Sequence, residues 1–402
     1  MDEDSNLDSK VNNDFLDRNI LLNYAMLIEE NNIFMNDPQY KNVYNLLCAI
    51  TDRLDSSIVV LNNIGDKMKS EDDFILFMVH ACFINDAINE ISGKSGLNIE
   101  KDIESSEIDP STIFRRDIIA SSLNITEDNC PSDKEFFAYL RAISTMHPFE
   151  TSRQTFLKVH GEKHISPFPI VKSKYGRGTQ VGARIYSTNF EDIIDLLIPL
   201  ESVKDYILSR YLLLNKISEK MQEIIATKEA TWREKKVSTT LRPIDALHEV
   251  RKKLVECYKE TDSVDKAIMY LDYPLTNVEN QENVCLYQKT IIDIIPQLVE
   301  AVNDLDFEQM EILLNVVHRP NKDQHNYALE KIFGYIDKKD EYPDNYEFAI
   351  EQAESVANSF ANNWVTIDCK KMHPTEIKLL LLTAFFLEKE KNHNDSKANV
   401  TQ

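Results

Sequence analysis

Apolar residues recur every three or four positions along most of this chain, a spacing that places them on one face of an α-helix. The pattern is clearest over residues 40–63 and 71–93, which are separated by a short polar segment. Two such helices, closely joined, are expected to form an antiparallel pair. Weaker patterns predict helices over residues 15–30, 112–124 and 132–147. Pro148 ends the last one, because a proline disfavours helical backbone in the residue before it. These segments predict an N-terminal helical bundle.

After Pro199 the apolar positions follow the four-three spacing of a long helix that packs lengthwise against a second helix. These positions are Val203, Ile207, Leu214, Ile217, Met221 and Ile224. The expected partner helix begins at Pro243, because proline suits the first turn of a helix; a dimerising coiled coil is the alternative. Further helices are predicted over residues 282–317, 323–338, 345–363 and 374–392. No unit repeats at a fixed period, so we expect an irregular helical domain rather than a solenoid.

One segment favours β-structure. Residues 170–171 and 181–186 contain β-branched and aromatic residues, and they flank residues 175–179, which include two glycines. A β-hairpin with Arg177 at its tip is expected. The predicted fold class is therefore all-α, mostly helical, with four parts. They are an acidic flexible lead-in over residues 1–20, a helical bundle over 21–151, a basic β-hairpin segment over 152–190, and a helical C-terminal domain with the long heptad helix over 191–402.

Glycine is scarce in this sequence. The chain has 8 glycines in 402 residues, about 2% where soluble proteins average roughly 7%. Sandwiches, barrels and propellers need many turns with positive φ, and dinucleotide or phosphate loops need closely spaced glycines. The composition therefore disfavours turn-rich β-folds and the common nucleotide-binding folds.

The net charge is −22, from 45 basic and 67 acidic residues. Such a chain as a whole repels nucleic acid and anionic membranes. Residues 152–184 are the exception, because they hold seven basic residues and one acid. Any contact with nucleic acid is expected there.

The cysteines and the apolar segments indicate the cellular compartment of the protein. Six cysteines lie far apart in the sequence, which is typical of reduced, mostly buried thiols in a cytoplasmic protein. The first residues, Met-Asp-Glu-Asp, are unlike a signal peptide, and the longest apolar run, residues 379–387, is about half as long as a membrane span. A cytoplasmic protein with no membrane segment is expected.

The strongest candidate site lies in the helix predicted over residues 132–147, where Arg141 is followed, after five further residues, by His147. This Arg-x5-His motif at the end of a helical bundle resembles the motif of the HEPN superfamily, over about residues 25–150. The resemblance implies a metal-independent endoribonuclease with Arg141 and His147 as catalytic residues. It also implies a homodimer in which the motifs of the two subunits meet. Members of this superfamily are common in bacterial toxin and phage-defence systems, so the resemblance implies a role of that kind.

These residue types suit that chemistry. A histidine can pass protons near neutral pH, and an arginine can stabilise the extra negative charge that forms when a ribose 2′-OH attacks the neighbouring phosphate. The predicted RNA-binding residues are Arg153, Lys172, Lys174 and Arg177. No cofactor and no metal are expected. His160 and His164 have a spacing that suits a metal on a helix, but Gly161 and the nearby lysines oppose it.

A structural interpretation of the same residues stays open. His147 lies on the helical face of Phe136, Leu140 and Ile143, so it is alternatively a core or cap histidine, with Arg141 as a surface ion-pair partner. The basic residues would then pair with acids elsewhere on the chain. The rival function is a non-catalytic helical protein-interaction or regulatory protein that binds a protein partner through its C-terminal helices.

Overall fold

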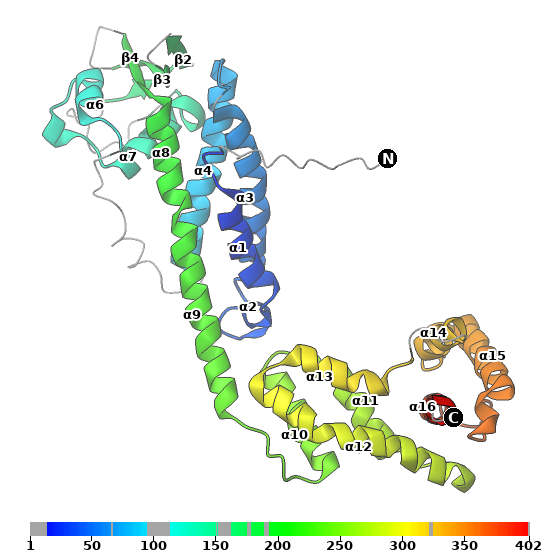
Figure 1. The fold of residues 1–402 in the computed structure, drawn as a ribbon. Helices are drawn as coiled ribbons and strands as arrows, with labels where there is room; N and C mark the ends of the chain where they lie inside the picture. The colour runs from blue at the N-terminus through cyan, green and yellow to red at the C-terminus, as the bar shows by residue number, and fades with distance from the viewer. Residues whose placement is uncertain are drawn as a thin grey trace. The chain divides into compact units, whose positions relative to one another are not determined.

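The computed structural model describes residues 14–65, 67–94, 113–149, 151, 162–174, 178–188, 193–320 and 325–400. The internal contacts of the chain divide it into two compact units, unit 1 (Met1–Ala226) and unit 2 (Thr227–Gln402). Helices make up most of both units, and a small antiparallel sheet belongs to unit 1 (Figure 1). The prediction of a mostly helical protein is therefore confirmed.

The first helices of unit 1 are α1 (Arg18–Glu29), α2 (Asn32–Asn36), α3 (Tyr44–Gly65) and α4 (Glu71–Lys94). α3 and α4 pack along each other, and α1 packs on α3 (Figure 1). Their core faces follow the predicted three-four spacing, since the residues at those positions are at most 1% exposed: Leu54, Ile58 and Leu61 on α3, and Phe74, Phe77 and Ile84 on α4. Hydrophobic burial of this face holds the helices together.

A second group of short helices follows: α6 (Arg116–Leu123), the 3-10 turn η1 (Glu127–Asn129), α7 (Asp133–Arg141) and the π-helical turn η2 (Ala142–Met146). α7 begins with a capping box. The Ser132 hydroxyl accepts the backbone N–H of Glu135, and the Glu135 carboxylate accepts that of Ser132. The buried Asp133 carboxylate accepts the N–H groups of Ile113 and Phe114. These bonds fix the start of the helix that carries Arg141.

The sheet consists of β1 (His164–Ile165), β2 (Pro169–Lys174), β3 (Gly178–Ser187) and β4 (Ile194–Pro199). β3 is the central strand, and it pairs antiparallel with the other three. The predicted hairpin is the β2–β3 pair, although its tip at residues 175–177 lies outside the described residues. Gly182 lies where β3 meets β4 most closely, because a Cβ there would lie 1.8 Å from the carbonyl oxygen of Leu196.

Two consecutive helices carry the predicted heptad positions, α8 (Leu200–Tyr211) and α9 (Leu213–Glu234). Val203, Ile207, Leu214, Ile217 and Met221 are all buried. α8 packs against α4, where Arg210 donates to the side-chain oxygen of Asn89 at 3.0 Å. The heptad positions, from Val203 to Ile224, therefore belong to unit 1, which ends at Ala226 inside α9. The spacing identified the buried face correctly, and α4 packs against the part of it that α8 carries.

The helices of unit 2 are α10 (Pro243–Glu256), α11 (Asp262–Leu271), α12 (Gln281–Asp304), α13 (Phe307–Leu314), α14 (Asn326–Tyr335), α15 (Pro343–Ser359) and α16 (Pro374–Val400). Three 3-10 turns lie between them, η3 (Val278–Asn280), η4 (Asn315–Val317) and η5 (Ala361–Asn363). The core includes Leu254, Tyr287, Leu298, Ile332 and Leu380. α12 is central to it, since it packs against α10, α13 and α16.

The single helix predicted over residues 282–317 is wrong. α12 tolerates Pro296 in its interior and ends at Leu305, which has the left-handed φ of 61°. α13 then begins after Asp306, whose carboxylate accepts the backbone N–H of Gln309. The left-handed residue and the cap divide the predicted helix in two.

One helix bears on the membrane prediction. Of the described residues, only the stretch Glu71–Gly93 in α4 is long and apolar enough to cross a membrane by length and composition. Half of its apolar window is buried inside the protein, and the core helix of a soluble protein meets the same criterion. The prediction of no membrane segment thus stays a prediction. All six cysteines are free thiols, and Cys82, Cys130, Cys257 and Cys369 are buried.

Candidate functional site

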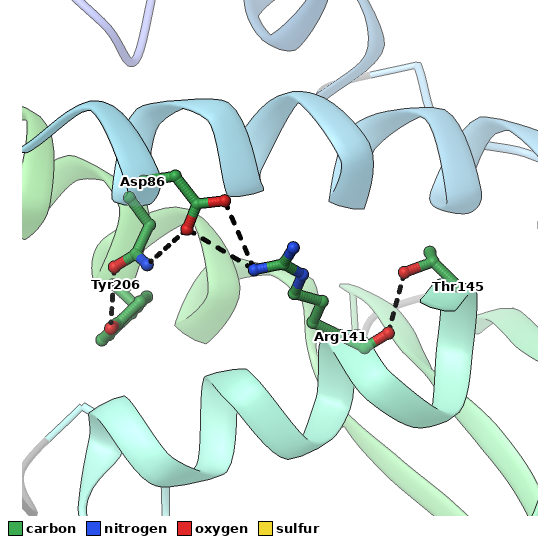
Figure 2. A network of polar contacts seen from close by, with 5 residues as sticks. Asp86, Arg141, Thr145 and Tyr206 are labelled. Carbon is green, nitrogen blue, oxygen red and sulfur yellow. Dashed lines mark hydrogen bonds and ion pairs between the residues drawn. The ribbon is translucent and has the colours of Figure 1, made fainter. Parts of the chain in front are cut away.

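Arg141 is the last residue of α7, and its guanidinium points toward α4 (Figure 2). Its Nη1 lies 3.4 Å from both carboxylate oxygens of Asp86. The Arg141 side chain is 35% exposed and that of Asp86 is 48% exposed. A charge-assisted hydrogen bond usually measures about 2.7–2.9 Å, so this contact is long and partly in water. It holds Arg141 without burying it.

Asp86 belongs to a chain of polar contacts that reaches α8 (Figure 2). Asn85 donates to the Asp86 carboxylate, and the Tyr206 hydroxyl donates to the side-chain oxygen of Asn85, both at 3.4 Å. Cys82 lies one turn before Asp86, and burial raises the pKa of its thiol to about 12. The charged pair is therefore anchored by α4 and α8, and burial disfavours the reactive thiolate form of the neighbouring cysteine.

A π-helical turn, Ala142–Met146, separates Arg141 from His147. The backbone N–H of His147 donates to the carbonyl of Ala142 at 2.8 Å, five residues earlier. The Thr145 hydroxyl donates to the carbonyl of Arg141 at 2.8 Å (Figure 2). π-turns are rare, and they occur frequently at functional sites. The turn also packs against α4 and β3.

His147 ends this turn and is exposed to solvent. Its backbone carbonyl accepts the hydroxyl of Thr151 at 2.8 Å, but its ring has no hydrogen-bond partner among the described residues. Of the core and cap alternatives for His147, the core interpretation is therefore wrong, although Phe136, Leu140 and Ile143 are buried as predicted. The π-turn accounts for this, because it changes the helical phase between Ile143 and His147. The cap interpretation agrees with the structure, since His147 is the C-cap residue of the π-turn. For Arg141, the predicted ion pair is present.

Only two of the four predicted RNA-binding residues, Lys172 and Lys174, belong to the described part of the chain. Lys172 on β2 donates to Asp195 on β4 at 3.1 Å, and Arg184 on β3 donates to the same carboxylate at 2.8 and 3.1 Å. These bonds lower the pKa of Asp195 to about 2. Lys174 is the last residue of β2, whereas Arg153 and Arg177 lie outside the described residues. Lys172 is thus engaged within the sheet, and it is the only one of the four predicted RNA-binding residues whose side-chain contacts are described.

Sequence reasoning missed a buried polar network behind this site. The Tyr139 hydroxyl lies 2.6 Å from Nδ1 of His164, and Nε2 of His164 lies 3.1 Å from Oε1 of Glu162. Ser187 donates to the same Glu162 oxygen at 2.6 Å. Burial lowers the pKa of His164, so the neutral ring accepts from Tyr139 and donates to Glu162. Both nitrogens of His164 are used, and the network ties α7 to β1 and β3.

No group of three or more His, Cys, Asp or Glu side chains able to hold a metal is present among the described residues. His160, the other member of the histidine pair considered from the sequence, lies outside them.

Comparisons of the chain with protein-family models, with curated proteins and with solved structures found no match.

Proposed function

We propose that unit 1 is a HEPN-like, metal-independent endoribonuclease that cleaves RNA by attack of the 2′-OH on the adjacent phosphate. The observation that carries this proposal is the π-turn between Arg141 and His147. It leaves both side chains accessible to solvent at one end of α7, where a substrate can reach them. If Arg141 and His147 were buried, or if acidic partners occupied both side chains fully, they could not contact the RNA phosphate.

His147 acts in this proposal as the general acid or base. An imidazole exchanges protons near neutral pH, and a ring with no bound partner among the described residues is free to contact a ribose hydroxyl or a leaving oxygen. Substituting such an exposed ring leaves the core intact.

Arg141 stabilises the phosphate as its negative charge grows. Only Nη1 of its guanidinium is hydrogen-bonded among the described residues, to Asp86, so its other N–H groups remain available to phosphate oxygens. Asp86 has a positioning role, since its carboxylate aims the guanidinium from α4.

The wider assembly follows from the same resemblance. A homodimer would bring two copies of the motif together, and the basic β-hairpin segment, with Arg153, Lys174 and Arg177, would hold the RNA backbone. The C-terminal helices would regulate the nuclease or recruit a protein partner. A cytoplasmic toxin or phage-defence system is the setting that this arrangement suits.

A specific observation favours a second function, that of a non-catalytic helical protein-interaction protein. Arg141 pairs with Asp86 and Lys172 pairs with Asp195, so two of the proposed RNA contacts already have acidic partners. In this account, both pairs are structural and the helices serve only to bind another protein.

Cleavage assays on variants separate the two functions. His147→Ala and Arg141→Ala are each expected to slow cleavage of a labelled RNA at least about 100-fold. The matched control is the double variant Arg242→Ala, His248→Ala, which removes an Arg and a His of the same spacing from exposed positions of unit 2. It should cleave at the parent rate. Parent-rate cleavage by His147→Ala would overturn the assignment.

A further inference from the structure

Unit 2 contains a cavity of about 560 Å³ at the start of α16. Its walls come from α11, the residues after η4, α14 and the first turn of α16. The titratable side chains that line it are Lys266, Tyr270, His318, Arg319, Asp337, His373 and Lys378. This volume lies within the range of about 300–1,000 Å³ that is typical of small-molecule sites.

The cavity is positively charged in a chain of net charge −22. Lys378 is 8% exposed and forms an ion pair with Asp337, the one acid in the lining among the described residues. Lys266 and Arg319 have no carboxylate partner in the described part of the chain. Arg319 donates only to the backbone and side-chain oxygens of Asn326. Among the described residues, the cavity wall therefore holds two cations that form no ion pair.

The segment at the start of α16 adds a histidine donor to this wall. The backbone N–H of Thr375 donates to Nδ1 of His373 at 3.2 Å, so the neutral His373 ring carries its proton on Nε2 and can donate it. The acid in this first turn, Glu376, does not line the cavity, since its carboxylate accepts the backbone N–H and the hydroxyl of Thr276 at 2.7 and 2.6 Å. The Glu376 carboxylate is thus directed at Thr276 rather than at the cavity, and the His373 ring is the donor that the start of α16 adds to the wall.

His318 supplies an acceptor. The Ser263 hydroxyl donates its one hydrogen bond to the Glu311 carboxylate at 3.0 Å. The same hydroxyl oxygen therefore accepts from Nε2 of His318, also at 3.0 Å. Burial and the nearby Lys266 lower the pKa of His318. The neutral ring then presents Nδ1 as an acceptor, which suits a hydroxyl of the ligand. Phe333 and Met269 provide apolar wall beside these groups.

We propose that this cavity binds a small phosphomonoester that also carries hydroxyl groups, such as a sugar phosphate. The phosphate would contact Lys266, Arg319 and the Nε2–H of His373, and a hydroxyl would donate to His318. The site consists of residues of unit 2 alone, so it does not depend on the ribonuclease proposal.

Isothermal titration calorimetry of the full chain at low ionic strength tests this with three probes: ribose 5-phosphate, inorganic phosphate and ribose. Ribose 5-phosphate is expected to bind, and ribose is not. Inorganic phosphate should bind at least about tenfold more weakly than the ester, because it lacks the hydroxyl contacts. Equal affinity for the two would overturn the phosphomonoester assignment in favour of free phosphate.

Two variants locate the binding. Lys266→Gln and Arg319→Gln should each weaken the binding of ribose 5-phosphate by about tenfold or more, because each removes a charge-assisted contact. Lys289→Gln is the matched control, since Lys289 is exposed, belongs to the same unit and does not line the cavity. It should bind like the parent. No binding of the ester at millimolar concentration, or unchanged affinity in both cavity variants, would overturn the proposal.

Discussion

Individual charged side chains of unit 1 are placed by partners that lie far away in the sequence. Arg141 is held by Asp86, 55 residues earlier, and Lys172 and Arg184 share Asp195. Exposed ion pairs contribute about 0–1 kcal/mol each, so their main effect is on position rather than on stability. Asp195 differs because it joins two cations and is only 28% exposed.

The stability of unit 1 should depend on pH through Asp195. The pKa of Asp195 falls from 3.8 to about 2 in the folded protein, so its ionised form stabilises the fold above about pH 4 and this contribution disappears as the pH falls toward 2. Asp195→Asn should lower the free energy of unfolding at pH 7 by about 1–2 kcal/mol, after allowance for solvent screening. Urea unfolding of parent and variant between about pH 7 and pH 3 measures this. A difference that stays constant over this range would contradict it.

At the scale of elements, α7 and the sheet are joined by buried polar groups as well as by apolar packing. Glu162 and His164 are 4% and 1% exposed. Each polar atom of such a network must find a partner, because an unsatisfied buried group costs about 1–3 kcal/mol. The Tyr139–His164–Glu162 contacts therefore fix how α7, and with it Arg141, is oriented.

Loss of the central member of this network should destabilise unit 1. His164→Ala leaves the Tyr139 hydroxyl and the Glu162 carboxylate without their partner, and should cost about 2–4 kcal/mol of unfolding free energy. His147→Ala is the matched histidine control, and it should change stability by less than about 0.5 kcal/mol because that ring is exposed. Urea unfolding followed by circular dichroism compares the two. Equal stability of both variants would show that the network is not structural.

The sheet depends on a close approach of two strands at one glycine. Gly182→Ala would place a methyl group 1.8 Å from the Leu196 carbonyl oxygen, so β3 and β4 must move apart, and unit 1 should lose about 2 kcal/mol or more. Gly334→Ala is the control, since a Cβ there meets nothing within 4 Å and α14 should gain about 0.5–1 kcal/mol. Thermal unfolding ranks the two. A Gly182→Ala protein as stable as the parent would contradict the observed register.

At the scale of the whole molecule, periodicity predicted the helices well where one apolar face is continuous. Phe74, Phe77 and Ile84 marked α4, and Pro148 marked the end of the segment that contains His147. The same pattern did not predict that α8, which carries the buried Val203 and Ile207, packs against α4. Spacing defines which face of a helix is buried, but it does not define which element covers that face.

The candidate site was predictable only in part. Arg141 and His147 are visible as a motif, but the π-turn between them results from hydrogen bonding that no local propensity indicates. Asp86 and the His164 network depend on contacts across 55 and 25 residues, which a single sequence does not reveal. The cavity of unit 2 likewise combines residues from four separate segments.

The most direct test of the central claim is to analyse the ends of RNA cut by the purified protein in excess chelator. The account predicts cleavage by the parent that leaves 2′,3′-cyclic phosphate ends, the product of 2′-OH attack, and none by the double variant Arg141→Ala, His147→Ala. Cleavage by the double variant at the parent rate, or products without cyclic phosphate ends, would contradict it.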